Sequence, residues 1–278
     1  MSEDNPSGGD GRHHMDSLLM RESLLDKDLV AQSGENIDVV RMLPDARVVK
    51  VGGRSIIDQG RKALFPVADA LGEALAERQL IIGTGGGARS RHVFSIGLDL
   101  ALPTGVLAQL AIADALGNAH ILGTLLAPHG VVAIPPEIFG HLLPFFVRGA
   151  PGVIFNGDPP YQIWEHPPPV GRIPPHRTDA GSYLTAECFG CKTFTLIKDV
   201  DGLYTSDPRT NSGAELIKEI SVGEIQKRGI ESLPFDEVLL ELLPKARLVD
   251  RFQIVNGLKP ELIIPALDGE HVGTIVHA

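Results

Sequence analysis

Two glycine-rich stretches in this 278-residue chain combine backbone freedom with nearby positive charge, which suits them to hold phosphate or another oxyanion. Residues 50–54 (KVGGR) and residues 83–89 (GTGGGAR) each follow a run of apolar, strand-forming residues. Glycine lets the backbone approach a ligand closely, and the N-terminus of a following helix adds partial positive charge. Lys50, at a strand end, could place its ammonium over a bound or transferring phosphoryl group. The alternative is a tight turn with a solvent-exposed lysine.

The second stretch points more strongly to an anion site. Three consecutive glycines carry a high entropic cost on folding, which predicts a steric reason for their presence. Arg89, Arg91 and His92 follow at a predicted helix start, where cations oppose the helix dipole unless an anion lies between them. Neither stretch contains the P-loop pattern or the G-x-G-x-x-G dinucleotide pattern, so neither motif alone identifies the ligand.

An acid-rich turn after another predicted strand, residues 198–208 (KDVDGLYTSDP), suits a nucleotide. Asp199 and Asp201 could bind ribose hydroxyls or water around Mg²⁺, and Tyr204 could border a purine ring. A calcium loop is a poorer match because the full D-x-[DN]-x-[DN]-G-x₅-E pattern is missing. An ordinary Asp-Gly turn remains an open alternative.

Residues 173–181 (IPPHRTDAG) place a carboxylate and two basic groups at a predicted helix start. Thr178 or Asp179 could cap the helix that follows, and capping alone would explain the carboxylate. If the strand ends converge, however, Asp179 faces the phosphate cradle and could orient Lys50 or a metal-bound water. His176 and Arg177 would then lie at the rim. A capped helix with basic residues on the surface is the alternative.

The elements that must position these residues alternate between short strands and helices. Strands are predicted in VVKVGG, QLIIG, VVAIP, GVIFNG, TFTLIK, FQIVNG and GTIVHA, and helices in PVADALGEALAE and on both sides of Pro103. Glycines at strand ends are typical of a mainly parallel sheet covered on both faces. We therefore expect one α/β domain over residues 46–278, preceded by an amphipathic N-terminal arm over residues 16–45 and a disordered tail over residues 1–15.

Composition excludes several classes of protein. Hydrophobic residues make up 43% of the chain and supply a core, whereas 5% aromatic residues and a net charge of −10 argue against nucleic acid as a partner. We find no secretory signal and no apolar run of membrane-spanning length, so we expect a cytoplasmic protein with no membrane partner. Cys188 and Cys191 stand at a predicted helix end, and we interpret them as buried packing thiols rather than a redox pair.

Taken together, these motifs resemble the amino acid kinase family in its uridylate-kinase-like branch. Order and approximate spacing agree from Lys50 to the closing segment GEHVGT at residues 269–274. The resemblance implies a three-layer α/β/α sandwich with ATP bound across the carboxyl ends of the strands, and catalytic roles for Lys50 and Asp179. The nucleotide-binding residues that it implies are Gly52, Gly53, Arg54, Lys198, Asp199, Asp201, Tyr204, Asp207 and Pro208, and the anion-binding residues are Gly85, Gly86, Gly87 and Arg89.

Within that family the chain is similar to a molybdenum-storing branch, and in particular to its beta-type chains. The segments that carry this similarity include GTGGGARSRHVFSIGLDLALPTGVLAQL, DPPYQIW, RIPPHRTDAG and FGCKTFTLIKDVDGLYTSDP. The resemblance implies a hexameric cage formed with a related alpha-type subunit, in which molybdate or tungstate is deposited as polyoxometalate clusters with ATP and Mg²⁺. His129 matches a histidine of the beta-type chains, and we name His129, His166 and His176 as candidate metal ligands. A helix-cap or surface role is the alternative for His129.

Two departures from that branch leave the chemistry of this chain open. Tyr161 is followed by Gln-Ile-Trp where alpha-type chains have a histidine cluster, and Lys198 stands where an acidic or small polar residue would suit Mg²⁺ better. The chain could store metal oxyanion with ATP-dependent uptake, or transfer a phosphoryl group as a nucleoside monophosphate kinase. A third alternative is a subunit that binds nucleotide without catalysis. Whether this chain itself hydrolyses ATP stays open.

Overall fold

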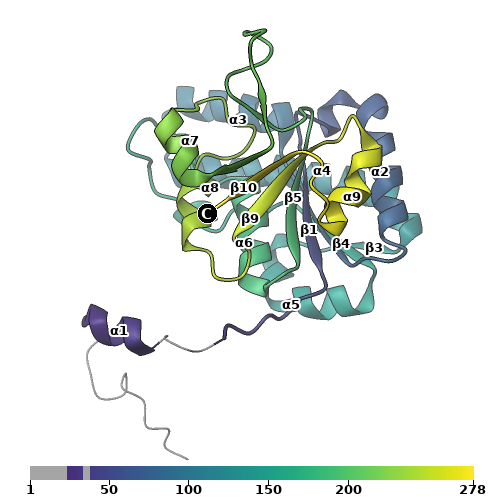
Figure 1. Ribbon diagram of the computed structural model, residues 1–278, viewed down its shortest axis with the longest axis horizontal. Helices are drawn as coiled ribbons and strands as arrows, with labels where there is room; N and C mark the ends of the chain where they lie inside the picture. The colour runs from purple at the N-terminus through teal and green to yellow at the C-terminus, as the bar shows by residue number, and fades with distance from the viewer. Residues whose placement is uncertain (1–23, 34–37) are drawn as a thin grey trace, which may run out of the picture. The chain divides into compact units, whose positions relative to one another are not determined.

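A mainly parallel sheet lies at the centre of the fold. The computed structural model describes residues 24–33 and 38–278, and Val40–Ala278 form one compact unit. The strands of the main sheet are β1 (Arg47–Val51), β2 (Leu80–Thr84), β3 (Val131–Ala133), β4 (Gly152–Phe155), β5 (Thr193–Lys198), β8 (Glu219–Ser221), β9 (Arg251–Asn256) and β10 (Thr274–His277). Their order is β3-β4-β2-β1-β5-β9-β10-β8, and every neighbouring pair except β9–β10 is parallel (Figure 1).

Helices cover both faces of this sheet, which makes the fold a three-layer α/β/α sandwich (Figure 1). The helices of the compact unit are α2 (Arg61–Ala74), α3 (Gly87–Asp99), α4 (Thr104–Leu126), α5 (Pro136–Gly149), α6 (Thr178–Phe189), α7 (Val222–Arg228), α8 (Leu239–Leu242) and α9 (Ile263–Asp268). The sheet forms two hydrophobic cores with these helices. One face of the sheet packs against α5, α6, α7 and α8, and the other packs against α2, α4 and α9. Because successive strand side chains alternate between faces, Val48 enters the first core and Val49 the second.

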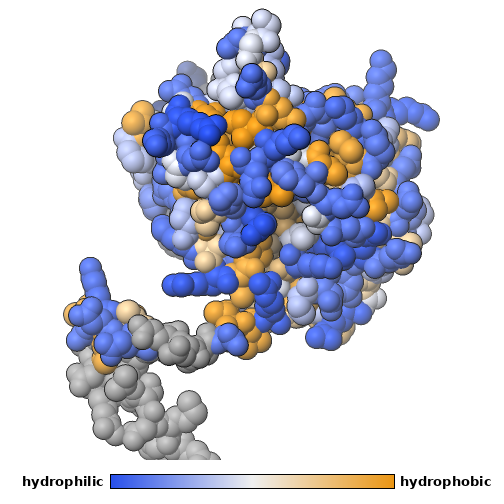
Figure 2. All heavy atoms as spheres, viewed as in Figure 1, coloured by the Kyte–Doolittle hydropathy of each residue, from blue (hydrophilic) through white to orange (hydrophobic). Residues whose placement is uncertain are grey.

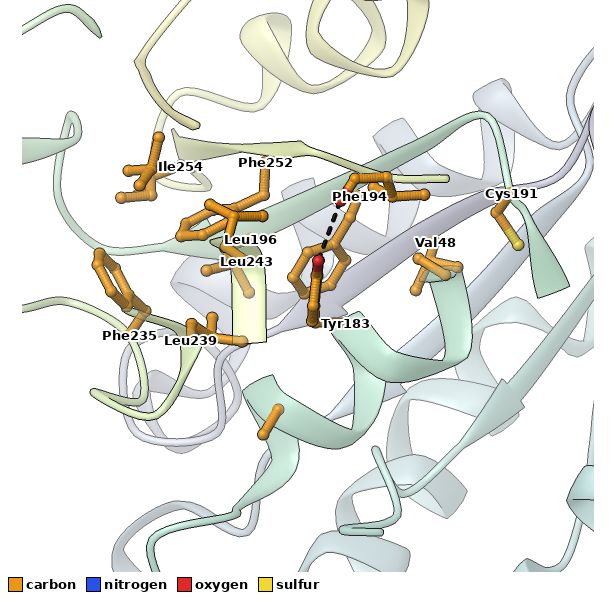
Figure 3. Packing of buried hydrophobic residues seen from close by; sticks show 14 of the residues in the cluster. Val48, Tyr183, Cys191, Phe194, Leu196, Phe235, Leu239, Leu243, Phe252 and Ile254 are labelled. Carbon is orange, nitrogen blue, oxygen red and sulfur yellow. Dashed lines mark hydrogen bonds between the residues drawn. The ribbon is translucent and has the colours of Figure 1, made fainter. Parts of the chain in front are cut away.

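The core on the α6 side is built around aromatic rings (Figure 3). The ring of Phe252 lies 6.0 Å from that of Phe194 and 5.2 Å from that of Phe235, edge to face in both pairs. Tyr183 of α6 packs beside Phe194, and its buried hydroxyl donates a hydrogen bond to the carbonyl of Val249 at 3.0 Å. This packing fixes α6 against the sheet and also anchors the segment that leads into α8.

Helix α4 is the single helix in the described ranges that is long and apolar enough, by length and composition, to cross a membrane. Pro103 stands at its N-cap and separates it from α3, as predicted. Helix α4 packs against α2, α3 and strands β2, β3 and β4. The expectation that no apolar run reaches membrane-spanning length was therefore wrong for α4 by this criterion. Apolar core helices pass the same test, so the absence of a membrane partner stays a prediction.

All seven predicted strands are present, and the predicted α/β fold with a mainly parallel sheet is confirmed. The sequence did not reveal β6 (Leu203–Tyr204) and β7 (Leu216–Ile217), which form a separate antiparallel hairpin, or the edge strand β8. Strands of two or three residues are too short to show an alternating pattern. The compact unit begins at Val40, a few residues before the predicted domain boundary at residue 46.

Two further predictions concern the N-terminal region and the cysteines. The predicted tail (residues 1–15) and the first part of the predicted arm lie outside the described residues, and within the unit Met1–Val39 the structure gives α1 (Lys27–Ser33). Cys191 is fully buried, as predicted. The prediction for Cys188 was wrong, because this residue near the C-terminal end of α6 is exposed.

Candidate phosphate-binding site

A cavity of about 750 Å³ opens where β1, β2 and β5 end. The strands run parallel, with β1 between β2 and β5, so the segments that follow their carboxyl ends meet at one edge of the sheet. Both glycine loops line the cavity, as do residues 173–179 in part and much of the acid-rich turn at residues 198–208. The convergence that the sequence predicted is therefore found.

Lys50, Asp179 and Lys198 form a buried charge cluster in the wall of this cavity. The Asp179 carboxylate lies 2.5 Å from the Nζ of Lys50 and 2.8 Å from the Nζ of Lys198. Burial opposes ionisation of Asp179, but the two lysines outweigh it and hold the carboxyl pKa well below its usual range. Burial lowers the pKa of Lys198 to about 8, although Asp179 opposes this. Two ammonium groups share one carboxylate, which leaves positive charge to attract an oxyanion.

The two glycine loops touch each other directly. A Cβ atom added to Gly53 would lie 2.5 Å from the carbonyl oxygen of Gly85 and 2.7 Å from the Cα of Gly87, so only glycine fits there. The N–H of Gly52 donates to the Ile197 carbonyl, and that of Gly85 donates to Val51. Within the described part of the chain, the N–H groups of Gly53, Gly86 and Gly87 donate to no protein acceptor. All three glycines line the cavity, so we expect their N–H groups to be the ones that contact a ligand.

A carboxylate from the chain itself binds at the N-terminus of α3. The Asp58 carboxylate accepts a hydrogen bond from the N–H of Ala88 at 2.6 Å. The conflict between the basic residues at this helix start and the helix dipole is thus resolved inside the chain, and it no longer requires a ligand. The guanidinium of Arg89 donates to Asn118 instead of lining the cavity. Arg91, two residues further along α3, does line it.

Besides Arg209, which pairs with Asp207, three arginines line the cavity from three different segments: Arg54, Arg91 and Arg177. Burial lowers the pKa of Arg91, and the charges of Arg54 and Arg177 lower it further. Mutual repulsion of this kind weakens when an anion binds between the guanidinium groups. The arginines therefore add a second positive surface beside the two lysines.

The start of α6 differs from its predicted form. Thr178 and Asp179 both lie inside the helix, Arg177 occupies the N-cap position, and no local side chain caps it. The prediction that Thr178 or Asp179 caps the helix was therefore wrong. The Asp236 carboxylate caps it instead, accepting from the N–H groups of Asp179 at 3.0 Å and Ala180 at 3.3 Å. No sequence signal near α6 could have identified a cap that lies 57 residues away.

Most of the predicted nucleotide-binding residues surround the same cavity. Gly52, Gly53, Arg54, Lys198, Asp199, Tyr204, Asp207 and Pro208 all line it. Asp201 is absent from the lining, because its carboxylate accepts from the Nδ2 of Asn256 at 2.9 Å and pairs with the Nζ of Lys259 at 2.6 Å. The carboxylate of Asp207 forms an ion pair with Arg209 at 3.0 Å.

The three candidate histidines do not form one group: the rings of His166 and His176 lie 6.5 Å and 4.8 Å from the ring of Tyr161, and His129 is apart from them. His129 lies against α2, where a Cβ on Gly72 would meet its imidazole Nε2 at 2.5 Å. His176 lines the cavity and its Nδ1 lies 3.2 Å from the buried carboxylate of Glu165, whereas exposed His166 does not line it. Among residues 24–33 and 38–278, no group of three or more His, Cys, Asp or Glu side chains could hold a metal ion. The assignment of these histidines to metal stays a prediction.

Known proteins resemble this chain in sequence and in fold. The model of the amino acid kinase family matches residues 45–246. Molybdenum storage protein subunit beta of Azotobacter vinelandii is 45% identical over 267 residues, which cover 95% of this chain and 97% of that protein. The uridylate kinase of Methanothermobacter thermautotrophicus is 28% identical over 237 residues, covering 82% of this chain and 97% of the kinase.

Solved structures support the fold. Uridylate kinase from Archaeoglobus fulgidus superimposes with a TM-score of 0.65 at 22% identity, covering 83% of this chain and 99% of that one. UMP kinase from Bacillus anthracis gives a TM-score of 0.66 at 18% identity, covering 84% and 96%. At these identities the likeness shows a shared architecture, and the predicted three-layer α/β/α fold is confirmed.

Proposed function

This chain belongs to the amino acid kinase family, and from that premise we propose that it stores molybdenum as an oxyanion with the help of a bound nucleotide. The observation that carries the proposal is the 45% identity to a molybdenum storage protein subunit over 95% of the chain. The match to the family model, over residues 45–246, includes every segment that lines the cavity. The charges of the cavity support the proposal independently, because they suit phosphate and metal oxyanions alike.

We assign the nucleotide, with ATP as the proposed species, to the half of the cavity between the glycine loops and the turn at residues 198–208. Lys50 and Lys198 would hold phosphate oxygens together with the free N–H groups of the glycine loops. Asp199, Tyr204 and Pro208 would border the nucleoside. Catalytic roles for Lys50 and Asp179 stay proposals, as does hydrolysis of ATP by this chain.

Mg²⁺ fits this cavity as part of a nucleotide complex. Magnesium keeps several waters and is commonly bound through one or two carboxylates plus substrate phosphates. Asp179 is engaged by two lysines and Asp207 by Arg209, so Asp199 is the lining carboxylate best suited to contact the ion's waters. Bound there, the ion would neutralise phosphate charge.

The cargo is proposed to be molybdate or tungstate, deposited as polyoxometalate clusters. A tetrahedral oxyanion presents oxygens much as a phosphoryl group does, so Arg91 and Arg177 suit its passage through the part of the cavity beside the nucleotide. His129, His166 and His176 remain proposed ligands of the deposited metal.

We propose that the chain assembles with a related alpha-type subunit into a hexameric cage in the cytoplasm. The name of the relative, a subunit beta, supports a partner chain. Figure 2 shows apolar side chains grouped on an otherwise hydrophilic face, as expected of a subunit. Exposed apolar side chains on α3, α4 and α5 add further surface for association: Ile96, Leu110, Ile121, Leu142 and Phe145.

A nucleoside monophosphate kinase is the second candidate. The observation in its favour is the buried lysine–aspartate–lysine cluster, which could stabilise a transferring phosphoryl group by charge and position alone. Against it, the part of the cavity wall that α3 and α4 supply includes the apolar side chains of Leu98, Ala108, Ala111 and Ile112. These side chains offer no hydrogen bond to a pyrimidine.

The proposed function is tested by loading the purified protein with molybdate, in the presence or absence of ATP and Mg²⁺. After gel filtration, elemental analysis should find molybdenum in the protein fraction, and more of it in the sample that received ATP. Protein that retains no molybdenum under either condition would contradict storage. A coupled assay with UMP or CMP separates the kinase candidate, because storage predicts no ADP formation above the rate without acceptor.

A further inference from the structure

The start of α6 and the segment before α8 hold each other through a pair of aspartates 57 residues apart in sequence. The Asp236 carboxylate accepts from the N–H groups of Asp179 and Ala180, and the N–H of Asp236 in turn donates to the Asp179 carboxylate at 3.2 Å. Both residues are buried, with 2% of Asp179 and 7% of Asp236 exposed. The exchange fixes the backbone from which Asp179 projects and also the direction of its carboxylate.

Asp236 is itself firmly placed. The neighbouring Phe235 inserts its ring beside Phe252 in the aromatic core (Figure 3). The second carboxylate oxygen of Asp236 accepts from the Nε of Arg177 at 3.0 Å. This single side chain therefore connects the core, a basic residue of the cavity wall and the central carboxylate of the lysine cluster.

The charges around Asp179 require a second carboxylate. Lys50, Lys198 and Arg177 bring three cations to the start of α6, where the helix dipole adds partial positive charge. Asp179 and Asp236 together leave one net positive charge among these five groups. Without Asp236, three cations would share one carboxylate, so less negative charge would offset the positive charge around Asp179.

We propose that Asp236 is a positioning residue of the phosphate site, which holds Asp179 and through it the ammonium groups of Lys50 and Lys198 in the arrangement that phosphate oxygens require. The inference rests on the proposed function, namely that nucleotide phosphates bind at these lysines. Asp236 contacts no phosphate; its effect passes through the hydrogen bonds and charge that it brings to Asp179.

A positioning role has a signature in the pH dependence of nucleotide binding. Burial lowers the pKa of Lys198 to about 8; Asp179 and Asp236 act to raise it, and Lys50 acts to lower it. A phosphate binds the charged ammonium, so affinity falls as the pH rises through this pKa. Removal of the Asp236 charge lowers the pKa of Lys198 further, and the loss of affinity then begins at lower pH.

The other end of α6 offers a matched control. The Glu187 carboxylate accepts from the backbone N–H groups of Arg247 at 2.6 Å and Val249 at 2.7 Å. Like Asp236, it ties α6 to a later segment through a carboxylate and two or more amides. Glu187 does not line the cavity, so its loss should affect stability alone.

The experiment measures the dissociation constant of ATP with Mg²⁺ for the full chain, Asp236→Asn and Glu187→Gln, from about pH 6.5 to about pH 9.5, a range that spans the titration of Lys198. Urea unfolding of each protein is measured alongside. We expect Asp236→Asn to bind ATP about tenfold more weakly at neutral pH and to lose affinity at lower pH than wild type. Glu187→Gln should be less stable but keep the wild-type affinity and pH profile.

Each outcome decides between a positioning role and a structural one. If Asp236→Asn matches Glu187→Gln in affinity and pH profile, Asp236 is a structural cap and the inference is wrong. If Asp236→Asn does not fold, Asp236→Glu replaces it; this variant keeps the charge, so it should bind more weakly with an unshifted pH profile, and wild-type affinity would overturn the inference. Failure of the wild-type chain to bind ATP would instead contradict the proposed function.

Discussion

Replacing Asp179 by asparagine tests the buried charge cluster directly. The carboxylate lies within 2.8 Å of one lysine and 2.5 Å of the other, and the substitution removes its charge with little change of shape. Two buried ammonium groups then lose their shared partner. Removing one partner of a buried ion pair costs about 3–5 kcal/mol. We expect Asp179→Asn to lower the free energy of unfolding by about that amount at neutral pH.

The difference in the free energy of unfolding between wild type and Asp179→Asn should become smaller as the pH rises. Burial gives Lys198 a pKa of about 8 in the folded chain, against the ordinary value of 10.5; this difference corresponds to about 3 kcal/mol, at about 1.4 kcal/mol per pKa unit. Because the folded value is the lower one, the unfolded chain binds more protons between the two, and stability rises with pH across that window. In Asp179→Asn this rise in stability begins at a lower pH, because the carboxylate that raises the pKa of Lys198 is gone.

Urea unfolding followed by circular dichroism measures this effect in wild type and Asp179→Asn, at about pH 7 and about pH 9. Protein concentration must be held constant, because association contributes to apparent stability. A deficit below about 1 kcal/mol at the lower pH would show that the cluster does not carry the charge described here. A loss of stability that is equal at both pH values would contradict the claim that buried Lys198 titrates in this range.

Further predictions concern the glycine contact and the two thiols. Gly53→Ala should lower stability by about 1–3 kcal/mol and weaken ATP binding, because its Cβ would lie 2.5 Å from the Gly85 carbonyl oxygen. Gly140→Ala, inside α5 with nothing within 4 Å of the added Cβ, should leave ATP binding unchanged and raise stability by up to about 1 kcal/mol. Maleimide labelling of the folded chain should modify exposed Cys188 alone. Burial raises the pKa of Cys191 to about 12, so this thiol should react only after unfolding in urea, and labelling of both thiols in the folded chain would contradict the packing.

The sequence predicted the strands and the loops that follow them because these features are local. Val48 and Val49 belong to an apolar run followed by glycines, and such a run shows both a buried strand and the turn at its end. The order of the motifs then indicated the family, and the family placed Lys50 and Asp179 at one edge of the sheet. The structure brings those two charges into contact.

What the sequence could not reveal depends on contacts between distant segments. Asp58 caps α3 from 30 residues away and Asp236 caps α6 from 57 residues away, so no spacing rule for helix caps applies to either. Lys198 was interpreted as a departure that disfavours Mg²⁺, whereas in the structure it pairs with Asp179. The candidate histidines were chosen by residue type and family, and His129 lies against α2, away from the cavity.

Nucleotide binding by wild type and Lys50→Ala is the most direct test of the central claim that the two lysines and the glycine loops form one phosphate site. Lys50→Ala leaves Asp179 paired with Lys198, so the variant should fold, and Lys62→Ala, an exposed lysine of α2, serves as its control. ATP with Mg²⁺ should raise the melting temperature of wild type and Lys62→Ala, and bind Lys50→Ala at least about tenfold more weakly. A wild-type melting temperature that does not change when ATP is added, or an affinity for ATP that is unchanged in Lys50→Ala, would contradict the claim.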